Sequence, residues 1–325
     1  MNDPIDRPLP TAAGRVQRWV MPILSIALFL LACTAIYRIL GELDYAELSA
    51  KLASLSATQV ALALLCTLAS FMVLTGYDWS ALRYLRKAVP FRTVALAAFC
   101  GCAIANTVGA NILSGGSVRY RLYVPAGLRP LDVAQITLFG MLAYAVGNFV
   151  IASAALVLDP ALIARFVPLS EGVLRGIGIA GLVVILAELA VVFLRRAPLR
   201  LGRRTLQLPS WRIAVLQLMV TLTDIMLAGA CFYIVLNEPA VPFLGFLAVY
   251  TIATVAGMLS HVPGGLGVFE SILLISFHSL IPTAALAAAL LAYRVIYNLV
   301  PLLVATLLLT ARGLGEHRAG ARGDS

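Results

Sequence analysis

The chain has 325 residues, of which 61% are hydrophobic and 12% are charged, and 24 basic residues outnumber 15 acidic ones to give a net charge of +9. Soluble domains average about 45–50% apolar and about 25% charged residues, so a soluble fold of this composition would expose apolar patches that aggregate. The composition therefore excludes a soluble cytosolic enzyme and a disordered chain, and it predicts a polytopic membrane protein.

Segments that are long and apolar enough to cross a membrane begin at residue 20, since one crossing needs about 20 such residues. The first segment, 20–40, follows Arg15 and Arg18. It is longer than the apolar core of a cleavable signal peptide, about 7–15 residues, so we interpret it as a retained helix. The other clear candidates are, in chain order, 58–78, 132–158, 172–194, 211–236 and 284–311.

Two further apolar stretches, 93–113 and 241–260, lead directly into glycine-rich breaks. The two breaks read Ser114-Gly115-Gly116-Ser117 and His261-Val262-Pro263-Gly264-Gly265-Leu266-Gly267. Backbone groups freed by a break are tolerated at membrane depth only where they line a cavity or contact protein. We therefore expect two re-entrant segments, over 93–130 and 241–281, and the alternative for 241–281 is two consecutive full spans.

The distribution of basic residues indicates which side each loop faces. Four bases lie in 79–92 and six arginines in 195–212, and the positive-inside rule places such loops in the cytoplasm. A re-entrant segment over 93–130 keeps both loops on that side, whereas a full crossing would separate them. This layout predicts a cytoplasmic N-terminal segment over 1–19, a membrane domain over 20–312 and a cytoplasmic tail over 313–325.

The predicted elements also repeat. Each half of the membrane domain, 20–158 and 172–311, reads as helix, helix, glycine-interrupted segment, helix, and the second half begins on the opposite side. Paired interrupted segments at matching positions of inverted repeats are the best sequence indicator of a transporter's binding site. The fold class is thus all-α, with about six transmembrane helices and two re-entrant segments.

Ionisable residues inside membrane segments are expensive and need a partner or a function. Asp224 and Arg294 lie deep within 211–236 and 284–311, and they could pair with each other or line a polar pathway. Asp78 could be an ordinary interfacial residue, and His261 could satisfy broken backbone. The candidate pathway residues are Asp78, Arg119, Arg121, Asp224, Glu270 and Arg294, and the candidate pathway-shaping breaks are Gly115, Gly116, His261, Pro263, Gly264 and Gly265.

Motifs for enzymatic or cofactor chemistry do not fit this chain. The G-x-G-x-x-G match at 176–181 lies within a membrane helix with no preceding strand, where small residues favour close helix packing. The five cysteines lie within apolar segments and match neither a disulfide framework nor a zinc site. We expect no cofactor, no metal, no catalytic residues and no bound nucleic acid.

Buried arginines and carboxylates beside glycine-rich breaks suit a charged or zwitterionic amphiphile. The arginines would hold a phosphate through charge-assisted hydrogen bonds. The carboxylates Asp224 and Glu270 would balance a cationic head group or exchange protons. These residues favour lipid translocation, in which the head group crosses through protein while the acyl tails stay in lipid.

Three motifs carry a resemblance to a known family. They are Gly76-Tyr77-Asp78-Trp79, Ser114-Gly115-Gly116-Ser117-Val118-Arg119-Tyr120-Arg121-Leu122-Tyr123 and Pro263-Gly264-Gly265-Leu266-Gly267-Val268-Phe269-Glu270. Over roughly 58–312, the chain resembles the transmembrane, flippase-like domain of the bacterial lysylphosphatidylglycerol synthase family, the multiple peptide resistance factors.

That resemblance implies an inner-membrane flippase that moves lysyl- or alanyl-phosphatidylglycerol to the outer leaflet, which lowers the negative surface charge and confers resistance to cationic antimicrobial peptides. By the same motifs it implies that Asp78, Arg119, Arg121 and Glu270 are polar translocation residues. Full-length members add a soluble aminoacyltransferase domain that the sequence lacks, so an aminoacyltransferase domain or subunit is an expected partner, as is a second copy of the chain. The alternatives are the membrane part of an aminoacyltransferase and a non-transporting partner subunit of an envelope-lipid enzyme.

Overall fold

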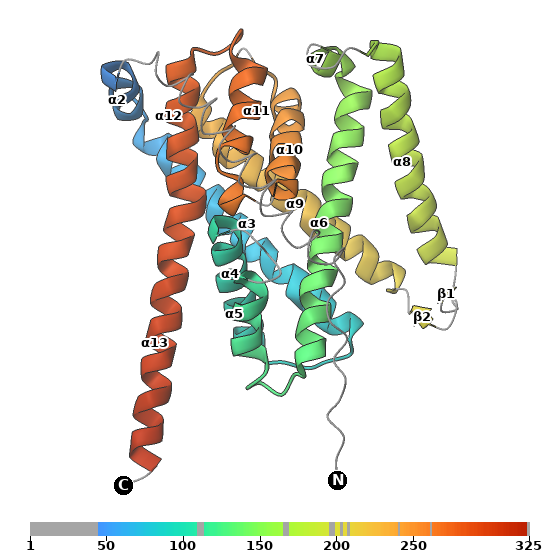
Figure 1. Cartoon of the computed structure of the whole chain (residues 1–325), viewed down its shortest axis with the longest axis vertical. Coiled ribbons are helices and arrows are strands. Elements are labelled where there is room, and N and C mark those ends of the chain that lie inside the picture. The colour runs from blue at the N-terminus through green and yellow to red at the C-terminus, as the bar shows by residue number, and fades with distance from the viewer. Residues whose placement is uncertain are drawn as a thin grey trace, which may run out of the picture.

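The structure is a computed structural model that describes residues 45–108, 114–164, 169–194, 199–201, 204–206, 209–239, 241–260 and 262–323. The predicted N-terminal segment 1–19 and first span 20–40 lie outside the described residues. Elsewhere the fold is helical apart from one two-stranded hairpin, which confirms an all-α polytopic membrane protein (Figure 1).

The elements follow the predicted order closely. They are α2 (Tyr45–Ala53), α3 (Ala57–Tyr84), α4 (Phe91–Val108), α5 (Ser114–Tyr123), α6 (Pro130–Leu158), α7 (Pro160–Ala164), α8 (Glu171–Leu194), β1 (Leu199–Leu201), β2 (Arg204–Leu206), α9 (Trp211–Leu236), α10 (Phe243–Leu259), η1 (Pro263–Gly265), α11 (Val268–Phe277), α12 (Thr283–Tyr293), η2 (Arg294–Leu299) and α13 (Val300–Gly323).

Five helices in the described part of the chain are long and apolar enough to cross a membrane: α3, α6, α8, α9 and the continuous Thr283–Arg312 helix formed by α12, η2 and the start of α13. Local sequence sets their ends. At the start of α3, the Ser56 hydroxyl accepts a hydrogen bond from the Gln59 amide, while the Gln59 side chain accepts one from the Ser56 amide. At the start of α6, Pro130 occupies the first turn, where a missing N–H costs nothing.

The two interrupted segments form hairpins that enter the bundle from opposite ends. Figure 1 shows α4 and α5 in the lower half of the molecule and α10 and α11 in the upper half. α11 has 10 residues and spans about 15 Å, half the hydrocarbon thickness, so it cannot cross. The alternative of two consecutive full spans over 241–281 is therefore wrong.

α3 and α9 pack along each other at the centre of the bundle, and their close approach depends on glycine. A Cβ at Gly76 of α3 would lie 2.7 Å from a methyl of Val220 in α9, and a Cβ at Gly147 of α6 would overlap Thr221. Small residues at such contacts let helix backbones approach closely in a membrane, where no hydrophobic effect drives helices together.

The two ends of the bundle differ in charge. The loops that lead into α4 and out of α5 carry Arg86, Lys87 and Arg129, and the last two form ion pairs with Asp132 at the start of α6, at 3.3 and 3.2 Å. The loops at the opposite end, 237–242 and 278–282, carry Glu238 and His278. The basic end is the one that the positive-inside rule assigns to the cytoplasm.

Candidate functional site

A cavity of about 530 Å³ lies between the two hairpins. Its walls come from both hairpins and from the spans that surround them, α3, α6, α9 and α12–η2. Most of the lining is apolar or aromatic, and three side chains of charged residues interrupt it: Arg119, Asp224 and Arg294. A cavity with charged side chains at this place is what paired interrupted segments predict.

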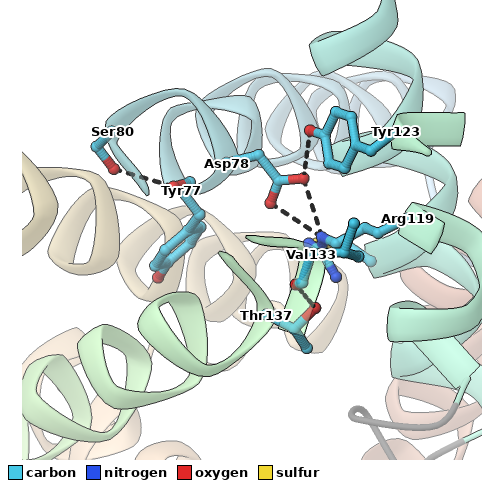
Figure 2. Close-up of polar contacts among 8 residues, drawn as sticks. Tyr77, Asp78, Ser80, Arg119, Tyr123, Val133 and Thr137 are labelled. Atoms are coloured by element: carbon cyan, nitrogen blue, oxygen red, sulfur yellow. Dashed lines mark hydrogen bonds and ion pairs between the residues drawn. The ribbon is translucent and has the colours of Figure 1, made fainter. Parts of the chain in front are cut away.

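The first arginine is held by a buried ion pair that joins α5 to α3 (Figure 2). The Arg119 Nε donates to both Asp78 carboxylate oxygens at 3.0 and 2.9 Å, and the Tyr123 hydroxyl donates to the Asp78 Oδ2 at 2.8 Å. The Asp78 residue is 1% exposed. Asp78 is therefore a buried, ion-paired residue, which favours the interpretation as a pathway residue over that as an ordinary interfacial residue.

Glycine brings α5 close enough to α4 to bury this pair. A Cβ at Gly115 would lie 2.9 Å from the Gly101 carbonyl oxygen of α4, and a Cβ at Gly101 would lie 3.2 Å from Arg119 Nη1. Gly115 and Gly116 lie in the first turn of α5, not between two helices as the sequence analysis expected. The physical reason for Gly115 is this contact, whereas Gly116 would meet only ordinary contacts with Thr137.

The second arginine joins the last membrane helix to the other hairpin. The Arg294 Nε donates to Glu270 Oε1 at 2.7 Å, and its Nη1 donates to the Gly264 carbonyl oxygen at 2.9 Å. The Glu270 Oε2 accepts from the Gly267 amide at 2.8 Å, which caps the start of α11. The expected alternative of an Asp224–Arg294 pair is therefore wrong, because Arg294 pairs with Glu270.

Arg294 also begins a π-helical segment, η2, within an otherwise α-helical span. Pro301 follows, and a proline ring clashes with the carbonyl four residues before it while removing a hydrogen-bond donor. Widened turns of this kind occur often at functional sites. The proline in an otherwise helical pattern was the sequence signal for this irregularity.

The tips of the two hairpins touch in the middle of the molecule. Gly264 adopts a φ of 61°, and a Cβ there would lie 2.8 Å from the Thr107 carbonyl oxygen. Next to this contact, the Asn298 Nδ2 donates to the Asn106 carbonyl oxygen at 3.2 Å. Gly265, with a φ of 62°, lies against Gly257 of α10. Glycine is thus required where the chain turns and the backbones meet.

Asp224 lines the same cavity from α9 and is 4% exposed. Its Oδ1 accepts a hydrogen bond from the Ser70 hydroxyl at 2.6 Å, and the Ser70 oxygen lies 2.8 Å from the Tyr297 hydroxyl. Among the described residues, no ion pair involves Asp224. It is therefore a buried carboxylate held by hydroxyl groups.

The cavity brings together most of the predicted pathway residues. Arg119, Asp224, Arg294, Gly264 and Gly265 line it, and the partners Asp78 and Glu270 lie behind the two arginines. Arg121 is exposed and is not part of the lining, Pro263 contributes its backbone to η1, and His261 lies outside the described residues. Ser70, Tyr144 and Tyr293 were not predicted from the sequence. The signal for Ser70 was a hydroxyl within an apolar span, but Thr67 and Thr75 of the same span carry one too.

Comparison with known proteins identifies the family. Residues 22–305 match the model of the lysylphosphatidylglycerol synthase TM region. The chain belongs to this family. The resemblance that the three motifs indicated is thereby confirmed.

The family includes relatives of different lengths. The chain is 32% identical to the uncharacterized protein slr0712 of Synechocystis over 317 residues. These residues make up 97% of this chain and 98% of that protein. It is 28% identical over 240 residues to the inner membrane protein YbhN of Escherichia coli, 73% of this chain and 74% of that protein. It is 23% identical over 306 residues to a phosphatidylglycerol lysyltransferase of Staphylococcus aureus, 90% of this chain but 34% of that enzyme.

Proposed function

We propose that this protein is a lipid flippase that moves aminoacylated phosphatidylglycerol, with a lysyl or alanyl group, from the inner to the outer leaflet of a bacterial inner membrane. The observation that carries the proposal is the cavity between two hairpins that enter from opposite ends, with arginines in its wall. A head group bound there is reachable from either side once one hairpin moves.

The arginines suit a phosphate. Each guanidinium has five N–H donors in a planar fork. Arg119 directs its Nε to Asp78 and its Nη2 to Cys102, and Arg294 directs donors to Glu270 and Gly264, so donors remain on both. A phosphate oxygen in this weakly polar cavity would accept charge-assisted hydrogen bonds from them.

The size and walls of the cavity suit a head group without its tails. The volume of about 530 Å³ falls within the range of about 300–1,000 Å³ that small-molecule sites occupy. The outer faces of the spans carry exposed leucine, valine and phenylalanine side chains, which lipid covers. In this arrangement the acyl tails stay in the membrane while the head group passes through protein.

The relatives favour the aminoacyl head group and the location. The staphylococcal enzyme that shares this region is a phosphatidylglycerol lysyltransferase, and YbhN is an inner membrane protein. We propose the same membrane, with both termini in the cytoplasm and an aminoacyltransferase domain or subunit as partner. Delivery of cationic lipid to the outer leaflet would lower the negative surface charge and give resistance to cationic antimicrobial peptides.

A leaflet-resolved assay tests the proposal. The full chain is reconstituted into liposomes that contain lysylphosphatidylglycerol, and outer-leaflet lipid is measured with a membrane-impermeant amine reagent. Wild-type protein should accelerate transfer, Arg294→Gln should slow it at least tenfold, and the control Arg175→Gln, an exposed residue of α8, should match wild type. Folded wild-type protein that leaves the distribution unchanged would overturn the proposal.

A further inference from the structure

The charges around the cavity do not balance. Two ion pairs, Asp78–Arg119 and Glu270–Arg294, are each neutral and close, with Nε–oxygen distances of 2.9 and 2.7 Å. Asp224 is a third carboxylate and the one that lines the cavity itself, where it accepts a hydrogen bond from the uncharged Ser70 hydroxyl. With Asp224 ionised, these three carboxylates outnumber the two arginines by one.

A buried carboxylate without a cation is costly, because burial removes its hydration and a hydroxyl returns only part of that energy. Of the three carboxylates, Asp78 and Glu270 are already neutralised by arginine, and Glu270 also caps α11. Asp224 alone among these three has the capacity to gain a cation from a ligand.

The side chains around Asp224 favour the binding of a cation there. Four tyrosines from four elements interact electrostatically with it: Tyr77 of α3, Tyr144 of α6, Tyr250 of α10 and Tyr297 of η2. The Cys102 thiol of α4 is the remaining titratable group, and it accepts a hydrogen bond from Arg119. Among the described residues, no arginine, lysine or histidine forms an ion pair with Asp224 itself. The same tyrosines line the cavity, and aromatic faces attract ammonium groups.

We propose that Asp224 and the surrounding tyrosines form the binding site for the ammonium group of the lipid head group, so that the protein selects lipids that carry an amine. This inference rests on the proposed function and adds a specificity-determining residue to it. A head group with one phosphate and one ammonium would place its phosphate at the arginines and its ammonium at Asp224.

Binding competition tests the site without using transport. Purified full-length protein in detergent is loaded with radiolabelled lysylphosphatidylglycerol, which is displaced by unlabelled lipid, by its di-N-acetylated form or by phosphatidylglycerol. Acetylation removes the charge and keeps the rest of the head group. A hydrogen bond to a charged group contributes about 1.5–3 kcal/mol, so wild type should prefer the unmodified lipid by roughly 10- to 100-fold.

Variants of Asp224 test whether this residue causes the preference for the unmodified lipid. Asp224→Asn keeps an acceptor for Ser70 and should bind unmodified and acetylated lipid within about threefold of each other, while its affinity for phosphatidylglycerol stays near the wild-type value. Asp224→Glu should retain the preference. The control Glu171→Gln, an exposed carboxyl at the start of α8, should leave the preference intact.

Several outcomes would overturn the inference. Wild-type protein that does not distinguish the acetylated lipid would refute it even if Asp224→Asn fails to fold. An Asp224→Asn variant that keeps the preference would refute it as well. If that variant keeps the preference but loses a pH dependence of transport, the carboxylate binds a proton and the inference fails. A preference without leaflet transfer would instead overturn the proposed function and leave the ammonium site standing.

Discussion

Gly264→Ala tests the contact between the hairpin tips. Gly264 has a φ of 61°, which a residue with a Cβ adopts at a cost of about 1–2 kcal/mol. The new Cβ would also lie 2.8 Å from the Thr107 carbonyl oxygen, well inside ordinary contact. Because that oxygen belongs to the backbone of α4, it cannot rotate away as a side chain would.

The two costs add to a measurable loss. Overpacking of a single group typically costs about 1–3 kcal/mol, so the total destabilisation should be about 2–5 kcal/mol. For a chain of 325 residues we expect a melting temperature lower by roughly 3–7 °C. Transport should fall too, since the separated tips change the shape of the cavity that Gly264 lines.

Alanine substitutions at two other glycines separate the backbone cost from the packing cost. Gly127 has a φ of 95° and open space around its Cβ position, so Gly127→Ala should lose only the backbone cost of about 1–2 kcal/mol. Gly176 lies in α8 with nothing within 4 Å, so Gly176→Ala should match wild type or gain slightly. The melting temperatures of the three alanine variants are compared with that of the wild type in the same detergent. If Gly264→Ala is no less stable than Gly127→Ala, the close contact between Gly264 and the Thr107 carbonyl oxygen is refuted.

Three further predictions follow from the packing and the topology. Asp78→Asn and Arg119→Gln should each cost about 3–5 kcal/mol because a buried charge loses its partner, and the double variant should lose much less than their sum in thermal unfolding. Gly147→Ala should lower the melting temperature by several degrees because its Cβ would overlap Thr221 of α9. A cysteine at Arg121 and one in the β1–β2 hairpin should react with an impermeant maleimide from the same side, and reaction from opposite sides would contradict the fold.

Much of the architecture follows from hydropathy and charge alone. Spans predicted at 58–78, 132–158, 172–194, 211–236 and 284–311 lie within or overlap α3, α6, α8, α9 and the last long helix. Apolar length is a local property that survives folding, because lipid surrounds each span. The arginine distribution then separates a re-entrant hairpin from a full crossing, which apolar length alone does not.

The pairing of the charged residues could not be predicted from the sequence. Asp224 and Arg294 both lie deep in their spans, yet Arg294 pairs with Glu270, 24 residues earlier, and Asp224 bonds to Ser70. Depth in a span is set by sequence position, whereas the direction of a side chain depends on helix rotation and crossing angle. Those depend on packing that only close contacts such as Gly76 against Val220 determine.

The two ion pairs each fasten a short helix of a hairpin, which Asp224 does not. α5 and α11 have 10 residues each, and isolated helices shorter than about 12–15 residues are marginal. Arg119 fastens α5 to α3, and Glu270 fastens α11 to the last long helix, so each pair holds the short returning arm of one hairpin against a full span. Loss of transport on breaking either pair would thus have two explanations. Asp224 lies in the middle of α9, which is long enough to span by itself, so a loss of amine preference in Asp224→Asn would support the proposed ammonium site without this ambiguity.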